Sequence, residues 1–258
     1  MNIDKEKVKK AFRDYVNEFD VEDEMIHLKK LHTINVASIC EDIGKSLSLS
    51  DEEIDLCFLV GMLHDIARFR QHTIYKTFYD YKSFDHAKMG CEILFDEGLI
   101  NRFVDEEDQD KDDIHLLRLA IRWHSAYRLP KNLNEKEKLF CNIIRDADKV
   151  DIFRVAIEEP VNNVYSVSRK EELDSEITPE VLEAFYEHHA IKRELRKTMA
   201  DVKVGFVALS FELVFPRSKE IAKEQGFLVR IIEDDYTNEN TIRQVEGIKN
   251  ELNNYLNH

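Results

Sequence analysis

The sequence predicts an all-α protein. Apolar residues recur at steps of three and four along most of the 258 residues, which is the period of an amphipathic helix. Only seven glycines and four prolines interrupt the chain, and so few breaks favour long helices over a sandwich of short strands. An apolar content of 43% is enough for a substantial core. A short strand over 226–232 is the one exception that we expect.

Caps and apolar periods predict the individual helices. Ser50 followed by Glu53 forms a capping box, Gly98 supplies a C-terminal cap, and Pro179 stands at a first helical position. By contrast, the aromatic and polar segment 66–85 has no clear period and is expected to be a loop over the domain. The helices predicted in chain order cover 3–19, 24–45, 50–64, 86–97, 114–124, 134–155, 178 onward, 200–215 (a buried helix ended by Pro216) and 242–252.

Composition limits the classes of function. Asp and Glu total 52 against 37 Lys and Arg, which gives a net charge of −15, so binding to nucleic acid is not expected. A small anionic substrate remains compatible, because a local cluster of cations sets the field of a cleft. The four cysteines are isolated in apolar stretches, as is typical of reduced core thiols. Without an apolar leader or a membrane-spanning run, we expect a cytoplasmic protein with no membrane partner.

Four polar residues stand where the helical period assigns core positions: His32, His64, His124 and Asp148. A buried histidine or carboxylate is costly unless it is hydrogen-bonded, paired or bound to a metal. For any one of them alone, a hydrogen-bonded core residue is the better interpretation. Four of them on four helices need a shared explanation. Convergence on a metal ion provides one, because the ion compensates all four groups.

His64 is followed by Asp65 where the periodic pattern gives way to irregular sequence. Adjacent helical residues point about 100° apart, so both side chains reach one ion only near a helix end. The change of pattern predicts such an end. Taken alone the pair is weak evidence, since a histidine beside an aspartate also arises by chance.

With His32 before this pair and Asp148 after it, the chain resembles the HD superfamily of metal-dependent phosphohydrolases. The segment 63–69, Leu-His-Asp-Ile-Ala-Arg-Phe, looks like the family's apolar helix followed by His-Asp. The segment 147–149, Ala-Asp-Lys, looks like its last motif. The resemblance covers about 24–155 and implies a helical bundle, to which the remaining C-terminal helices are additional.

The resemblance also implies a ligand set. His32, His64, Asp65 and Asp148 would bind one divalent ion. Asp146 competes for the last place, but it points off the apolar face of its helix and is expected to lie behind the ligands or on the surface.

Some members of the family add two histidines between the dyad and the last aspartate, and hold two ions bridged by the dyad aspartate. His86 and His124 fall in that order, so we expect a two-ion centre bridged by Asp65. The alternative for His86 is a solvated ring at a helix N-terminus. Histidine and carboxylate ligands suit iron, manganese, cobalt, zinc or nickel without choosing among them. The other histidines are expected at the surface or behind the site: His27, His72, His115, His188, His189 and His258.

The resemblance implies that a metal-activated hydroxide hydrolyses a phosphoester, with Asp65 orienting it. Arg68, three residues past Asp65, and Lys149, beside Asp148, are the candidate cations for the phosphate oxygens, although either has an ordinary surface role as its alternative. Aromatic residues within 69–84 would either stack on a nucleobase or cover the domain. A small phosphorylated substrate, with a preference for a nucleotide, is therefore expected.

Two other functions stay open at this point. One is a di-iron oxygenase of the HD type. Iron content and oxygen uptake without phosphatase activity would support it. The other is a non-catalytic, metal-stabilised module that senses a nucleotide or binds a partner.

The predicted organisation is an N-terminal helix over 1–23, the HD domain over 24–157, and a C-terminal helical extension over 158–258 that completes the fold and offers a surface for a homodimer.

Overall fold

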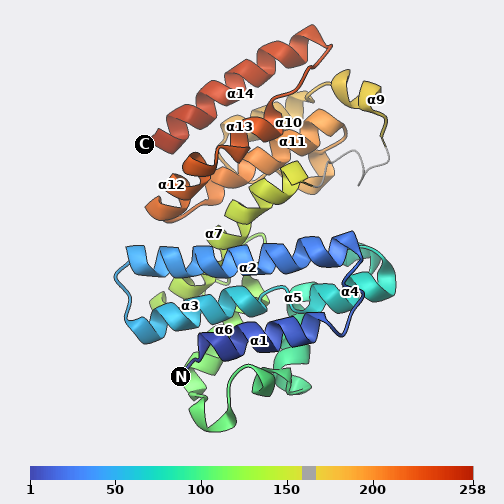
Figure 1. Ribbon diagram of the computed structural model, residues 1–258. Coiled ribbons are helices and arrows are strands. Elements are labelled where there is room, and N and C mark those ends of the chain that lie inside the picture. Colours follow the sequence, from blue (N-terminus) through green and yellow to red (C-terminus); the bar gives the residue numbers. More distant parts are fainter. Residues whose placement is uncertain (159–166, 258) are drawn as a thin grey trace. The chain divides into compact units, whose positions relative to one another are not determined.

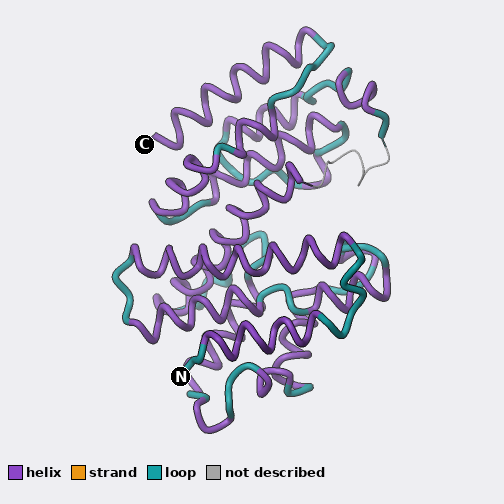
Figure 2. The backbone as a smooth tube through the Cα atoms, in the orientation of Figure 1, coloured by secondary structure: helices purple, strands orange, loops and turns teal. Residues whose placement is uncertain are grey.

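The computed structural model describes residues 1–158 and 167–257, and every regular element within these ranges is helical (Figure 2). The prediction of an all-α protein is therefore confirmed. The chain divides into two compact units, 1–148 and 149–258. This division falls inside α7 (Glu135–Glu158), whereas the boundaries predicted above at 23/24 and 157/158 remain predictions.

Two long helices, α2 (Glu24–Ser46) and α3 (Asp51–Leu63), lie side by side in the N-terminal unit (Figure 1). Gly61 permits their close approach, because a methyl group at this position would lie 2.5 Å from the Cα atom of Ala37. The capping box of Ser50 and Glu53 begins α3, as predicted. The other α-helices of the unit before α7 are α1 (Lys5–Val16), α4 (Ala67–Tyr75), α5 (His86–Cys91) and α6 (Lys111–Trp123).

The segment 66–85 is not a single loop, and this expectation was wrong. Its first half is helix α4, whose inward side carries the fully buried Phe69 together with Gln71 and the buried His72. Polar side chains on the buried face hide the apolar period from which a helix is recognised. After α4 only a short 3₁₀ turn, Asp80–Lys82, precedes α5.

The described residues of the C-terminal unit hold the end of α7 and six further α-helices: α9 (Arg169–Leu173), α10 (Pro179–Tyr186), α11 (Met199–Val207), α12 (Pro216–Gln225), α13 (Phe227–Ile232) and α14 (Glu239–Asn257). Inside it, the buried Lys203 pairs with Glu172 at 2.8 Å and with Asp234 at 2.5 Å. Paired in this way, the three charges are tolerated in a buried position.

Two predictions in this unit need correction. The stretch 226–232 is helical rather than a strand, since Gly226 in the left-handed region (φ +66°) ends α12 and α13 follows directly. The helix predicted over 200–215 ends at Val207 and continues as a 3₁₀ helix, Ala208–Glu212. Pro216 begins α12 instead of ending the previous helix, because proline is suited to a first helical position.

Gly61→Ala is expected to lower the free energy of unfolding by about 1–3 kcal/mol, since α2 and α3 must move apart. The added methyl group would lie 2.5 Å and 2.9 Å from backbone atoms of Ala37, which cannot rotate away. Gly44→Ala is the matched control, because its methyl group would meet only the side chains of Cys57 and Ile54, at 3.4 Å and beyond. Urea unfolding measures both variants. Equal stability of the two would contradict a packing role for Gly61.

None of the described helices is both long enough and apolar enough to cross a membrane.

Candidate metal centre

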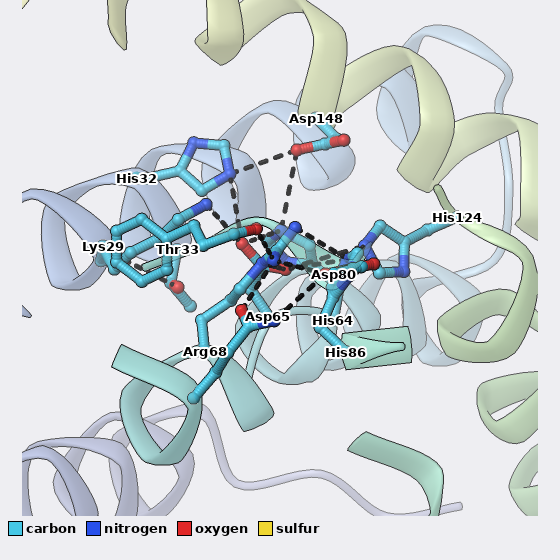
Figure 3. A network of polar contacts seen from close by, with 12 residues as sticks. Lys29, His32, Thr33, His64, Asp65, Arg68, Asp80, His86, His124 and Asp148 are labelled. Atoms are coloured by element: carbon cyan, nitrogen blue, oxygen red, sulfur yellow. Dashed lines mark hydrogen bonds and ion pairs between the residues drawn. The ribbon is translucent and has the colours of Figure 1, made fainter. Parts of the chain in front are cut away.

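Five elements of the N-terminal unit bring six acidic and imidazole side chains together (Figure 3). One comes from the middle of α2, two from the end of α3, one from the start of α5, one from just past α6, and one from α7. They are His32, His64, Asp65, His86, His124 and Asp148.

The pair His64-Asp65 lies at a helix end, as predicted. The last residue of α3 is Leu63, His64 is its C-terminal cap, and α4 begins again at Ala67. Both side chains of the pair are almost completely buried. The break between the two helices lets adjacent residues face the same interior point.

One oxygen of Asp65, Oδ2, faces a first group of ligands. It lies 3.8 Å from Nε2 of His32 and 3.7 Å from Nε2 of His64. Oδ1 of Asp148 lies 3.1 Å and 3.8 Å from the same two nitrogens. We call Asp65 Oδ2, His32, His64 and Asp148 the Oδ2 set. Two ligands that are each about 2.1 Å from one ion are at most about 4.2 Å apart, so these separations fit a shared ion.

The other oxygen of Asp65, Oδ1, faces a second group. It lies 3.5 Å from Nε2 of His86 and 3.6 Å from Nε2 of His124. The two imidazole nitrogens are 3.0 Å apart. We call Asp65 Oδ1, His86 and His124 the Oδ1 set. Asp65 therefore stands between two groups of ligands and presents one oxygen to each (Figure 3).

Hydrogen bonds on the far side of three rings fix where their protons are. Nδ1 of His64 donates to the carbonyl of Gly61 at 2.7 Å, and Nδ1 of His124 donates to that of Ile121 at 2.7 Å. Nδ1 of His86 donates to a carboxylate oxygen of Asp80 at 2.7 Å. In the neutral rings, each Nε2 then carries a lone pair that points inward. Nε2 of His64 is buried with no hydrogen-bond partner among the described residues. A metal cation is the partner that this nitrogen of His64 lacks.

Burial also sets the charge states that metal binding requires. Burial and the neighbouring His124 and His32 lower the pKa of His64 to about 3. Burial and Arg68 lower the pKa of His86 to about 4. Both rings are therefore neutral at pH 7, the form that coordinates a metal.

The two carboxylates are ionised. Burial alone would raise the pKa of Asp65, but Lys29, His64 and Arg68 hold it well below its usual range. For Asp148 the effect of burial is likewise outweighed, mainly by the hydrogen bond and charge of His32, so that its pKa is also well below its usual range. The neutral rings of His64 and His86 and the two charged carboxylates are donors suited to a divalent transition metal.

Two cations border the cluster. Nζ of Lys29 lies 2.7 Å from Asp65 Oδ2 and 5.3 Å from the centre of the Phe78 ring. Nε of Arg68 lies 3.5 Å from Asp65 Oδ1, and an outer nitrogen of the same guanidinium lies 3.2 Å from Nε2 of His86. Arg68 was expected from the sequence. Lys29 was not, although it lies one turn before His32 on α2.

Other residues considered from the sequence lie as follows. Lys149 follows Asp148 on α7 and is buried, as is Asp146, which was expected behind the ligands or on the surface. His72 is buried and contacts Asp23 at 3.0 Å. His27, His115 and His189 are exposed, and His188 is half-buried. His188 and His189 lie in the C-terminal unit, and His258 lies outside the described residues.

Comparison with protein families matches the part of the chain that carries the cluster. Residues 31–152 match the model of the family described as HD domain, a range that includes all six residues of the cluster. No curated protein and no solved structure matches the chain.

Proposed function

The chain belongs to the HD-domain superfamily of metal-dependent phosphohydrolases through residues 31–152, and from this we propose that it hydrolyses a phosphoester at a two-ion centre bridged by Asp65. The Oδ2 set would hold one ion and the Oδ1 set the other. The observation that carries the proposal is the placement of the Asp65 carboxylate, with one oxygen facing each set.

Divalent ions held in this way would supply hydroxide at neutral pH and polarise the phosphoryl oxygens. The protein's own residues supply the rest. Asp65 orients both ligand sets, and the backbone carbonyls of Gly61 and Ile121 keep His64 and His124 in the ligand tautomer. Lys29 and Arg68, with side chains 16% and 14% exposed, stand where negative charge on the phosphate would be offset. Lys149, next to Asp148, is a third candidate for this role.

A nucleotide is the substrate class that the neighbouring segment favours. The Phe78 ring lies 5.3 Å from Nζ of Lys29 and 5.9 Å from the guanidinium carbon of Arg68, so an aromatic face adjoins both candidate phosphate-binding cations. The rings of Tyr79 and Tyr81 lie 5.4 Å apart, and Tyr81 is 67% exposed. A base stacked on such a face would lie close to its phosphate.

The proposal is tested by metal analysis of the purified protein and by assays with a panel of phosphomonoesters and phosphodiesters, nucleotides included. Two divalent ions per chain together with release of phosphate or of a nucleoside product are expected. Iron with oxygen uptake and no hydrolysis would instead assign the centre to an oxygenase. A metal-loaded protein that is inert in both assays would reject catalysis.

Removal of metal is expected to lower the melting temperature. The lone pairs of the Oδ1 and Oδ2 sets converge only in the folded chain, so ions bind that state selectively. A ligand present at about 100 times its dissociation constant adds about 2.7 kcal/mol to the free energy of unfolding. Thermal unfolding with a chelator and then with added Mn²⁺ or Co²⁺ measures the shift. An unchanged melting temperature would mean that the cluster is a metal-free polar core.

A further inference from the structure

Three histidines of the cluster make a described hydrogen bond through Nδ1, and they are held in two different ways. His64 and His124 each donate to a carbonyl three residues earlier, so their own helices orient them. His86 instead donates to the side chain of Asp80 at 2.7 Å. Asp80 does not belong to a helix that carries a ligand; it begins the short 3₁₀ turn between α4 and α5. One histidine of the Oδ1 set thus depends on a side chain from a connecting segment.

The same carboxylate attaches this segment to α4. Oδ1 of Asp80 accepts hydrogen bonds from Arg68 at 2.8 Å and from Gln71 at 3.1 Å, while Oδ2 accepts the one from His86. Arg68 also donates to the carbonyl of Phe78, and Gln71 to the hydroxyl of Ser83. Asp80 is therefore the point at which segment 78–84, α4 and the His86 ring meet (Figure 3).

From this arrangement we infer that Asp80 is a positioning residue that makes the Oδ1 set, but not the Oδ2 set, depend on segment 78–84. A carboxylate acceptor keeps the proton on Nδ1 of His86, turns Nε2 toward Asp65, and increases the basicity of that nitrogen as a ligand. The inference rests on the two-ion function proposed above. It adds that the two sites differ in how they are supported, and that the second is assembled only when segment 78–84, which carries the candidate base-stacking residues, is in place.

A competing arrangement would use the same residues as an ion site of their own, since oxygens of Asp80 and Asp85 and a nitrogen of His86 lie within 4.8 Å of one another. The contacts favour the positioning role. The separation of 2.7 Å between Asp80 and His86 is that of a hydrogen bond, and Nδ1 cannot donate and coordinate at once. Asp85 already serves as the N-cap of α5, where it accepts from the backbone N–H of Lys88 at 2.9 Å.

The test is a calorimetric titration with Mn²⁺, supported by metal analysis, on four proteins: wild type, Asp80→Ala, Asp80→Asn and Asp85→Asn. In Asp80→Ala we expect one ion to keep its affinity and the other to bind about 10–100-fold more weakly. Asp80→Asn should fall between this variant and wild type, because its amide oxygen still accepts from Nδ1. Asp85→Asn keeps the helix cap and should bind both ions as wild type does.

Three results would overturn the inference: equal weakening of both ions in Asp80→Asn, no weakening in Asp80→Ala, or weakening in Asp85→Asn as large as in Asp80→Asn. The last would assign an ion to Asp80, Asp85 and His86. If Asp80→Ala fails to fold, Asp80→Asn still tests the inference, because asparagine keeps the size of the side chain and an oxygen that accepts a hydrogen bond. If the wild-type protein binds fewer than two ions, the two-ion function itself is rejected. The titration of the wild type gives this number before any variant is compared.

Discussion

Replacement of Asp65 by alanine is expected to remove both metal ions and to reduce phosphoester hydrolysis by at least about a thousand-fold. Loss of one group that stabilises the transition state costs about 10²–10³ in rate. Oδ1 of Asp65 lies 3.5 Å and 3.6 Å from the Nε2 atoms of the two histidines of the Oδ1 set, and its Oδ2 belongs to the Oδ2 set. Metal analysis and initial rates on the best substrate of the panel measure the two effects.

Asp55→Ala is the matched control for this experiment. Asp55 is also an aspartate of α3, but its side chain is 32% exposed and pairs with Lys5 at 2.6 Å, away from the cluster. It should retain both ions and the wild-type rate. If Asp65→Ala folded, bound metal and turned over as Asp55→Ala does, the cluster would be a polar core without catalytic use.

The sequence predicts the inward-facing members of the cluster because helical periodicity reports which face is buried. His32, His64 and His124 interrupt apolar stripes, and the structure places each of them at a relative exposure of 3% or less. His86 has no such stripe, since it is the first residue of the six-residue α5. Its candidacy rests on its order in the family pattern and on the small residues Ala87 and Gly90 that follow it. Periodicity therefore identifies ligands in the middle of long helices and is uninformative at short ones.

Two residues at the centre of the site were missed, for different reasons. Lys29 lies one turn before His32 on α2, but a lysine on an inward face is usually explained by its long apolar stem with the ammonium in water. Asp80 lies in a 3₁₀ turn, where no period exists, and its role depends on Arg68, Gln71 and His86, which reach it across 6–12 residues. Only the tertiary structure joins these four side chains. The helix α4 was missed for a related reason, because its buried face is partly polar.

Replacement of Lys29 by methionine is expected to tighten metal binding and to slow catalysis. In the metal-free protein the Lys29 ammonium is the cation nearest to Asp65, at 2.7 Å from Oδ2. Loss of the partner of a fully buried charge costs about 3–5 kcal/mol. The expected cost here is smaller, about 2 kcal/mol, because Nε of Arg68 remains 3.5 Å from Oδ1.

If an ion bound by the Oδ2 set compensates the negative charge of Asp65, the loss of Lys29 destabilises the metal-free state alone. The thermodynamic cycle then requires metal to bind the variant about 30-fold more tightly, since each 1.4 kcal/mol is a factor of ten. Turnover should change in the opposite direction. An ammonium released from Oδ2 is available to the phosphoryl oxygens, and its loss is expected to lower kcat by about 10²-fold.

The opposite signs of the two effects separate this role from a structural one. Metal titration, urea unfolding with a chelator, and initial rates are compared for Lys29→Met and for Lys30→Met, a control at the next position of α2. If Lys29 only supported the fold, its removal would weaken metal binding, because the ligand on α2, His32, would lose its position. Weaker binding, or an unchanged rate in the metal-saturated variant, would therefore show that Lys29 does not exchange between Asp65 and the substrate phosphate.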